Sequence, residues 1–546
     1  MTTALNICII GAASAKKEAD NSNKTGDSMT DSSTATLAPA SQPQFLGHPV
    51  GLYVCFLTEM WERFSFYGMK YLLLLYLTKY HLFSDAGGLD VLGSYAGLVY
   101  AMPVIGGMLA DRYLGMRKAV TFGAILLCLG HLGLAYEGFQ AYIENGVVVQ
   151  DSGAIQVFYF SLALIIMGVG FLKPNISTIV GQLYGKEDAR RDSGFTIFYM
   201  GINLGSFIAT ITVTYLGETY GWGYGFGLAG IGMVLGLIVF LAGQKYLFGY
   251  AEPANPALLK EKVFAGINKE WLIYLATLPA LFVVWQLVQY NPVVHNTLLG
   301  MSVVVLIGVI WFMVTQCNKV ERDRMLVLIV LTFSTVVFWA LFEQSASSMT
   351  LYADRVLDRN VFGYDATAGQ FGSLNAFFII TLAPFFAMLW IFLAKKGLEP
   401  STPVKFALGI IQAGLGFGAL VYGAQHPNDA GLVAAWWLIL AYMLHTMGEL
   451  CLSPVGLSAV TKLAVHKVVG VMMGAWFLAT AYSELLATQL AKLAAIDTHA
   501  GEVADVSQAL NAYTELFSFL MYFGVGVGVF MLLLSPWLRK RMHGVH

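Results

Sequence analysis

Long apolar stretches follow one another from residue 50 to residue 538, separated by short polar segments. Each is about 20 residues or longer, the length that an α-helix needs to cross ~30 Å of hydrocarbon. The runs are continuous and do not alternate with polar residues, so the pattern favours helices over a β-barrel. We predict fourteen membrane-spanning helices, over residues 50–80, 88–110, 116–136, 154–184, 192–216, 222–246, 270–290, 296–316, 324–352, 367–395, 402–424, 431–463, 467–496 and 511–538.

Residues 1–45 do not follow this pattern. They are rich in Ser, Thr, Asn, Asp and Ala and lack apolar periodicity, which predicts a disordered tail. No structural pattern precedes Met29, so both Met1 and Met29 stay open as the start of the protein.

The composition supports a protein that lies mostly within a membrane. Of 546 residues, 57% are hydrophobic and 12% charged, whereas about a quarter of a soluble protein is charged. This excludes a soluble enzyme and a disordered scaffold. A net charge of -2 excludes a nucleic-acid binder, which would need a basic surface. The five cysteines form no CxxC pair, so neither a disulfide framework nor a metal site is expected.

Loop charges predict the orientation of the chain. The loop after the second apolar stretch holds Arg112, Arg117 and Lys118, whereas the next loop holds Glu137 and Glu144. Basic loops stay on the cytoplasmic side of a membrane. The alternation predicts a multi-pass plasma-membrane protein with both termini in the cytoplasm.

The order of the apolar stretches predicts two halves. Six stretches occupy residues 46–247, two shorter ones follow a Pro- and Lys-bearing linker within residues 248–320, and six more occupy residues 321–546. Two six-helix bundles with a midplane substrate site are the plan of the major facilitator fold. The middle pair reads as an inserted hairpin that packs against lipid, because its apolar runs hold no ionisable residue.

Ionisable residues inside the apolar stretches are the candidate functional groups, since they are costly in a membrane unless they face a cavity or a partner. In the first stretch, Glu59, Glu62 and Arg63 share one helix face. Two carboxylates beside one guanidinium can take up a proton, because like charges raise one carboxyl pKa. The alternative is a structural ion pair.

Further charges lie in both predicted halves. Lys173 in the first half and Glu449 in the second predict a salt bridge between the halves, and Glu343 lies on one helix face with Trp339, four residues earlier. For each lone charge the alternative is a locally satisfied polar residue.

Two histidines also lie in apolar stretches. His445 shares the face of Glu449, whereas His131 stands alone. A proton relay and a hydrogen-bonded structural role are both open for them, and the structural role is the commoner one.

Six ordered motifs resemble those of the proton-dependent oligopeptide transporters, the POT family of the major facilitator superfamily. They are EMWERFSFYG, GGMLADRYLGMRK, GVGFLKPNIS, FYMGINLGS, FWALFEQ and GELCLSPVGLS, and the resemblance covers residues 45–540. The inserted hairpin is similar to that of the prokaryotic members. The resemblance implies a bacterial inner-membrane symporter, not an enzyme, that imports di- and tripeptides with protons by alternating access. It implies no cofactor, with protons as the coupling ion. The implied partners are peptides and the lipid bilayer. It also implies that a monomer is sufficient for transport, and the oligomeric state is open.

The resemblance also implies roles for particular residues. The proton-coupling set is Glu59, Glu62, Arg63, Lys173, Glu343 and Glu449. The substrate-binding set is Arg63, Tyr67, Tyr100, Lys173, Asn203, Trp339, Glu343, Asn375, Glu449, Ser453 and Trp476. The chain departs from the family pattern at Phe66, where Tyr is frequent, and at Lys70, where a second Arg is frequent. Its second stretch also lacks a histidine.

Elementary electrostatics fits these roles. A zwitterionic peptide needs a cation for its carboxylate and an anion for its amine, which Arg63 or Lys173 and Glu343 provide. Apolar walls from Trp339 and Trp476 suit variable side chains. The alternatives are another proton-coupled solute, such as nitrate, and a membrane peptide sensor. An intramembrane enzyme is disfavoured, because neither GxSxG nor HExxH occurs in an apolar stretch.

Overall fold

A computed structural model describes residues 42–185, 188–253, 255–264, 266–496 and 505–545. Residues 1–41, which make up most of the predicted tail, lie outside the described residues. The long helices of the described chain are α2 (Val50–Lys79), α3 (Asp85–Leu109), α4 (Met116–Leu134), α5 (Ser152–Gln182), α6 (Arg191–Tyr220), α7 (Trp222–Gly243), α9 (Lys269–Gln289), α10 (Asn291–Gln316), α11 (Lys319–Phe342), α13 (Ser373–Lys395), α14 (Thr402–Ala424), α15 (Ala435–Leu463), α16 (Val469–Ala491) and α17 (Val506–Arg541).

Each predicted apolar stretch overlaps one of these helices. Within the described residues, 13 helical segments are long and apolar enough to cross a membrane. The remaining helix, α2, is 30 residues long and carries Glu59, Glu62 and Arg63 within its apolar run. The predicted all-α membrane fold is therefore confirmed.

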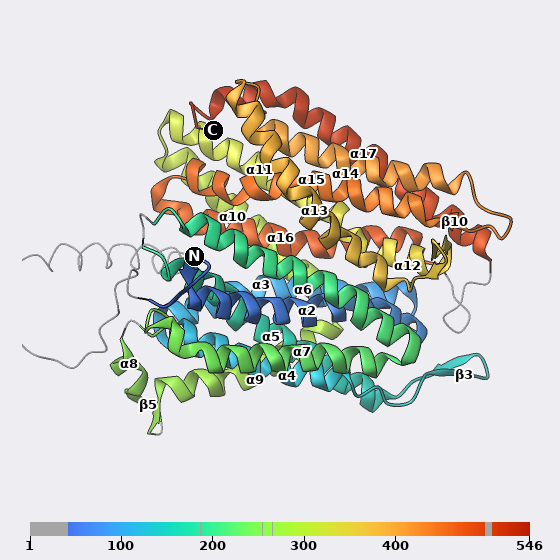
Figure 1. Cartoon of the computed structure of the whole chain (residues 1–546), viewed down its shortest axis with the longest axis horizontal. Helices are drawn as coiled ribbons and strands as arrows, with labels where there is room; N and C mark the ends of the chain where they lie inside the picture. Colours follow the sequence, from blue (N-terminus) through green and yellow to red (C-terminus); the bar gives the residue numbers. More distant parts are fainter. Residues whose placement is uncertain (1–41, 186–187, 254, 265, 497–504, 546) are drawn as a thin grey trace, which may run out of the picture.

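The helices form two groups, which Figure 1 shows as a blue-to-green layer and a yellow-to-red layer. In the first group α2 packs on α6 and α7, and α4 packs on α5; in the second, α14 packs on α15 and α17. Helix α9 packs mainly on α5, and α10 packs on α3 and α16, so the inserted hairpin contacts both groups. The N and C labels lie at the same end of the helices, together with α8 (Pro256–Lys260) and β5 (Lys262–Phe264).

Glycines allow the closest helix contacts. A Cβ on Gly106 of α3 would overlap the carbonyl oxygen of Gly170 on α5, and one on Gly524 of α17 would lie 2.9 Å from the Cα of Gly414 on α14. Gly170 O is also the carbonyl that Pro174, four residues later, leaves without its helical N–H partner. Small residues at such crossings are the usual solution in membranes, where backbones must approach to gain packing energy.

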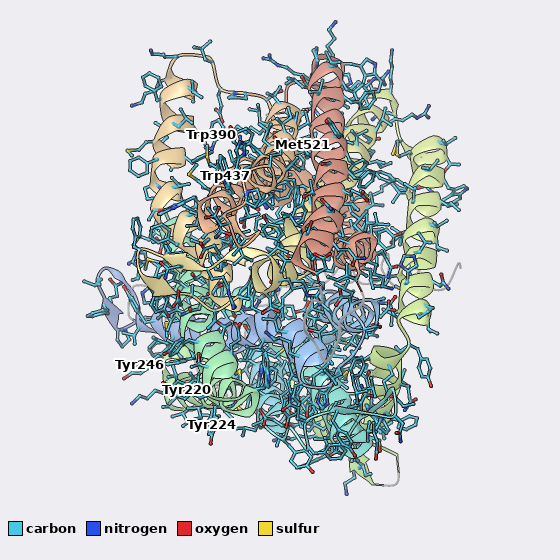
Figure 2. The ribbon with its side chains drawn as sticks, turned by 90° about the vertical axis from the view of Figure 1, so that its right-hand side faces the viewer. Tyr220, Tyr224, Tyr246, Trp390, Trp437 and Met521 are labelled. Atoms are coloured by element: carbon cyan, nitrogen blue, oxygen red, sulfur yellow. The ribbon has the colours of Figure 1, made fainter. Side chains whose placement is uncertain are left out.

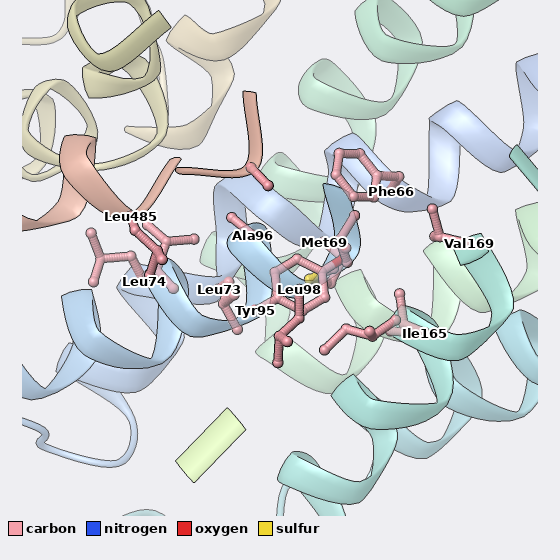
Figure 3. Close-up of a cluster of buried hydrophobic side chains, with 14 of the residues drawn as sticks. Phe66, Met69, Leu73, Leu74, Tyr95, Ala96, Leu98, Ile165, Val169 and Leu485 are labelled. Carbon is pink, nitrogen blue, oxygen red and sulfur yellow. The ribbon is translucent and has the colours of Figure 1, made fainter. Parts of the chain in front are cut away.

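A continuous apolar core joins the two groups near the middle of the molecule. Figure 3 shows Leu73 and Leu74 of α2, Tyr95 of α3, Ile165 of α5 and Leu485 of α16 in one buried cluster. The α16 side chain comes from the second group and packs over Gly97 of α3. This seam brings α2, α3 and α16 together beside the candidate site.

Exposed aromatic side chains lie on the periphery. Tyr220 and Tyr224, at the turn between α6 and α7, are 63% and 67% exposed, and Figure 2 shows them beside one another. On the other group, the half-buried Trp390 has its ring centroid 4.7 Å from the ammonium of Lys405. Tyrosines at helix ends are typical of the membrane–water interface.

Strands are short and confined to the connections. Antiparallel pairs join β1 (Gln44–Phe45) to β2 (His48–Pro49), β3 (Tyr142–Glu144) to β4 (Val147–Val149), β5 to β6 (Ile267–Asn268) and β8 (Asn360–Val361) to β9 (Tyr364–Asp365), and a parallel pair joins β7 (Leu357–Asp358) to β10 (Val433–Ala434).

One predicted span is interrupted. The stretch at 324–352 is not a single helix: α11 ends at Phe342, a 3₁₀ turn η4 (Glu343–Ala346) follows, and α12 (Ser348–Arg355) begins after it. The run EQSASS favours this break, because Ser side chains compete for backbone hydrogen bonds. Ser347 Oγ donates to Glu343 O, and Gln344 Nε2 donates to Ala340 O.

Candidate functional site

A cavity lies between the two helix groups. It is lined by Tyr67, Lys70, Tyr71, Tyr100, Tyr199, Ile202, Asn203, Ser206, Trp339, Phe342, Glu343, Ser345, Ala346, Asn375, Ile379 and Glu449. The first eight come from α2, α3 and α6, and the others come from α11, η4, α13 and α15. Both halves of the chain therefore build one polar and aromatic chamber.

The structure brings most of the predicted substrate residues to this chamber. Tyr67, Tyr100, Asn203, Trp339, Glu343, Asn375 and Glu449 all line it. Arg63, Lys173, Ser453 and Trp476 are not among its lining residues. The Trp476 ring packs against Gly456 of α15 and the ring of Phe406 on α14, which places it in the helix packing of the second half.

An ion-pair cluster centred on Lys70 links the two halves across the chamber. Its Nζ lies 2.8 Å from Glu343 Oε2, and 3.1 and 3.2 Å from the two carboxylate oxygens of Glu484 on α16. The side chains of Lys70 and Glu484 are each 4% exposed and that of Glu343 is 13% exposed. Lys70 of the first half thus holds two carboxylates of the second half.

Sequence reasoning did not single out Glu484. The signal was present, because Glu484 is an ionisable residue in the apolar segment AYSELLATQL. Its partner Lys70 is 414 positions away along the chain, and no local pattern connects them.

A second cluster occupies one face of α2, as predicted. Arg63 donates from Nη2 to Glu62 Oε1 at 2.6 Å and from Nε to Glu62 Oε2, and its Nε lies 3.4 Å from Glu59 Oε1. Its guanidinium carbon lies 4.7 Å from the ring centroid of Phe66, a cation–π distance. Glu59 Oε2 is buried and accepts no hydrogen bond from any described residue. Phe66, at the position where Tyr is frequent in the family, thus contacts Arg63 through its ring face and adds no hydroxyl group to the cluster.

The predicted salt bridge between Lys173 and Glu449 is not formed in this structure. Lys173 Nζ lies 4.5 Å from the ring centroid of Tyr100, on the neighbouring helix α3. Glu449 Oε2 instead accepts a hydrogen bond from Asn375 Nδ2 at 3.0 Å, and the same amide also donates to Thr446 Oγ1. Each of the two residues contacts a partner within its own half of the chain.

The four-residue spacing of Trp339 and Glu343 is helical in the structure. Glu343 caps the C-terminus of α11 with helical backbone angles, and its N–H donates to Trp339 O. Both side chains line the chamber, as expected for one helix face.

His445 has a structural contact. Its Nε2 lies 2.9 Å from Ala413 O on α14, and the ring is 1% exposed. His131, on α4, is also 1% exposed. Neither histidine lines the chamber, which supports the structural interpretation.

Ion pairs join the two halves at one end of the helices. We call this the sealed end: it is the end at which Lys79 terminates α2 and Asp85 begins α3. Arg355 of α12 donates to both oxygens of Asp85 at 2.6 and 2.7 Å, and Lys79 Nζ lies 2.8 Å from Asp354 Oδ1. Glu218 accepts from two backbone N–H groups just before η5 (Gly369–Gly372) and at its start. Each of these contacts joins the two halves.

The inserted hairpin takes part in the sealed end. Asn291, at the start of α10, donates to Asp90 O at 3.0 Å and to Ser94 Oγ at 3.1 Å, both on α3. Gln489 of α16 donates to Asn291 Oδ1 at 3.2 Å. One 5%-exposed amide of the hairpin therefore bridges both halves, which adds a polar contact to the predicted packing against lipid.

Comparison with known proteins identifies relatives along nearly the whole chain. The family model described as the POT family matches residues 117–514. An uncharacterized transporter, YclF of Bacillus subtilis, is 38% identical over 92% of this chain and 97% of its own. The peptide transporter YePEPT of Yersinia enterocolitica is 37% identical over 83% of this chain and 89% of its own, and the di-/tripeptide transporter of Lactococcus lactis is 33% identical over 92% and 99%.

Solved structures of POT family transporters are similar to this chain in fold. A mutant of a peptide transporter POT in complex with alafosfalin has 35% identity and a TM-score of 0.76, over 94% of this chain and 99% of that chain. A POT family transporter in complex with 5-aminolevulinic acid has 31% identity and a TM-score of 0.75, over 92% and 100%. The motifs, the two-half architecture and these similarities together establish that the chain is a multi-pass membrane transporter of the POT family.

Proposed function

We propose that this protein is a proton-coupled symporter that imports di- and tripeptides by alternating access. The observation that carries the proposal is the chamber in which Lys70 of the first half meets Glu343 of the second. A cavity that presents both signs of charge from two separate halves suits a zwitterionic ligand. The similar di- and tripeptide transporters support the same substrate class.

The charges around the chamber favour proton coupling. They comprise five carboxyl groups and three cations: Glu59, Glu62, Glu343, Glu449 and Glu484, with Arg63, Lys70 and Lys173. Three cations leave two carboxylates uncompensated, and an uncompensated charge inside a membrane is costly. Each proton taken up by this group of side chains neutralises one of these two charges.

In the proposed cycle, the ends of the peptide exchange with the ion pairs of the protein. The peptide amine binds Glu343, and its carboxylate binds the cations of the first half, Arg63 or Lys173. A proton taken up by Glu59 or Glu62 weakens the hold on Arg63, because a neutral carboxyl attracts the guanidinium less. The halves then rock about the chamber and release both cargoes on the other side.

We further propose that residues 46–247 and 321–546 move as two bodies, with residues 248–320 as linker and hairpin. The basic loops predict that both termini are cytoplasmic, which makes the sealed end the outer one. The protein then resides in a bacterial inner membrane, and the conformation described here is closed toward the outside.

The test is uptake of labelled dialanine by proteoliposomes with an inward proton gradient, with and without a protonophore. We expect accumulation that collapses when the protonophore is added. Folded protein that does not accumulate dialanine would overturn the proposal. Accumulation of another solute would then indicate a different substrate, and binding without accumulation would indicate a sensor.

A further inference from the structure

The two carboxylates that share Lys70 differ in their surroundings. Glu343 lines the chamber together with Lys70, and its side chain is 13% exposed. Glu484 is not among the lining residues, and its side chain is 4% exposed. The next residue, Leu485, packs on Gly97 of α3, so Glu484 approaches Lys70 from the packed interface of α3 and α16.

This arrangement separates two tasks. A ligand in the chamber can reach Glu343, whereas Glu484 stays behind Lys70 in the packed interface. Both oxygens of Glu484 lie within hydrogen-bond distance of Lys70 Nζ, and one oxygen of Glu343 does. The ammonium therefore has two carboxylate partners, and of these only Glu343 lines the chamber.

The energetic consequence concerns what happens to Lys70 when substrate arrives. If Glu343 were its sole partner, a peptide amine that bound Glu343 would leave a buried ammonium without a counter-ion. Breaking a buried ion pair in that way is strongly destabilising. A second carboxylate already in contact with the ammonium removes this penalty.

We infer that Glu484 is a positioning residue that retains Lys70 while Glu343 passes from Lys70 to the substrate amine. This inference rests on the proposed function. Lys70 keeps its proton throughout, and no covalent bond changes. The exchange replaces the ion pair between Lys70 and Glu343 by one between the peptide ammonium and Glu343, and the ion pair between Lys70 and Glu484 persists. Glu484 thereby strengthens recognition of a free amine without touching it.

The test compares dialanine with N-acetyl-dialanine, which lacks the charged amine, as substrates of the full chain in proteoliposomes. Counterflow without a proton gradient gives KM and kcat for dialanine, and competition gives the affinity of the acetylated peptide. For Glu484→Gln, we expect the preference for dialanine over the acetylated peptide to fall by roughly tenfold, a change of about 1.4 kcal/mol. The fall is expected in KM and not in kcat. A merely structural role would weaken both peptides alike.

Matched variants keep the inference falsifiable. Glu484→Asp retains the charge and is expected to keep most of the preference for dialanine. Glu484→Asn has a side chain of the same length as Asp but no charge, and it is expected to lose the preference. If Glu484→Gln does not fold, the comparison of the Asp and Asn variants decides the outcome. In a Lys70→Gln background, adding Glu484→Gln is expected to change nothing further, because Glu484 acts through Lys70.

Two results would overturn the inference. One is a wild-type preference in folded Glu484→Gln and Glu484→Asn. The other is an additional loss when Glu484→Gln is combined with Lys70→Gln. Failure of the proposed function looks different, because wild-type protein would then show no dialanine counterflow at all, and the inference would fall with it.

Discussion

Arg355 donates from Nη2 and Nη1 to the two carboxylate oxygens of Asp85, at 2.6 and 2.7 Å. This pair joins α12 to α3 across 270 positions of the sequence. Both side chains are almost fully buried, and Arg355 Nη1 also donates to Tyr513 Oη at 3.0 Å. Two parallel hydrogen bonds to a carboxylate are the strongest geometry available to an Arg. This contact anchors the sealed end, where the halves must part if the chamber is to open there.

Loss of the Arg355–Asp85 pair should destabilise the described conformation strongly. We expect Arg355→Ala to lower the free energy of unfolding by about 3–5 kcal/mol, because it leaves the Asp85 carboxylate buried without its cation. Thermal unfolding of purified protein measures the loss. Arg359→Ala is the matched control. The partly exposed Arg359 lies 3.9 Å from Asp354, which keeps its nearer partner Lys79, so its loss should cost under about 1 kcal/mol. Equal losses for both variants would contradict the assignment.

The hairpin amide should contribute to the same closure. Asn291→Ala removes the contacts to Asp90, Ser94 and Gln489, and hydrogen bonds between membrane helices are worth up to about 1–2 kcal/mol in total here. We expect a lower unfolding temperature for this variant. Asn296→Ala, at an exposed position of α10, should leave it unchanged. An unchanged temperature for both would mean that the bridge does not stabilise the closed halves.

The proton-coupling hypothesis predicts that Glu62→Gln loses gradient-driven accumulation but keeps counterflow. Glu62 makes both hydrogen bonds to Arg63, and the Gln variant keeps its shape without its charge or its ability to take up a proton. Gradient-driven accumulation of dialanine should fall to background, whereas counterflow without a gradient should persist. Accumulation by this variant at the wild-type level would rule out Glu62 as part of the coupling cluster.

The contribution of Lys173 to peptide uptake should depend on its contact with the ring of Tyr100. Lys173→Ala should fail to concentrate dialanine, because a cation of the first half is lost. Tyr100→Phe keeps the ring and is expected to retain uptake, whereas Tyr100→Leu removes the cation–π contact and should reduce it. Uptake assays on the three variants test this. Equal uptake by the Phe and Leu variants would show that the ring does not hold the cation.

A buried histidine outside the spans should make stability depend on pH. Burial lowers the pKa of His81 from 6.5 to about 4, and its Nε2 lies 2.8 Å from Tyr76 Oη. The unfolded chain therefore binds more protons than the folded one between these values, so His81 stabilises the fold above about pH 6.5 and loses that contribution as pH falls toward 4. Unfolding temperatures measured from pH 7 to pH 4 should fall less steeply for His81→Phe than for wild type. Substitution of the exposed His426 by Phe should leave the slope as it is.

The sequence by itself determined the helices and the identity of the unusual charges. Apolar runs long enough to span a membrane must form helices there, because no water is available to satisfy the backbone. The resulting spans, such as Val50–Lys79 and Ser152–Gln182, match the predicted ones closely. Ionisable residues such as Glu59 and Lys173 could be identified from the sequence, because a charge within an apolar span is costly and therefore rare.

Tertiary structure decided which charges meet. Lys70 pairs with Glu343 and Glu484, at separations of 273 and 414 positions, whereas the predicted Lys173–Glu449 bridge is absent from this structure. Helical periodicity gives the face on which a charge lies, but not the depth or rotation at which two distant helices pack. Ion pairs act over a few ångströms, and that precision comes only from the packing of the two halves.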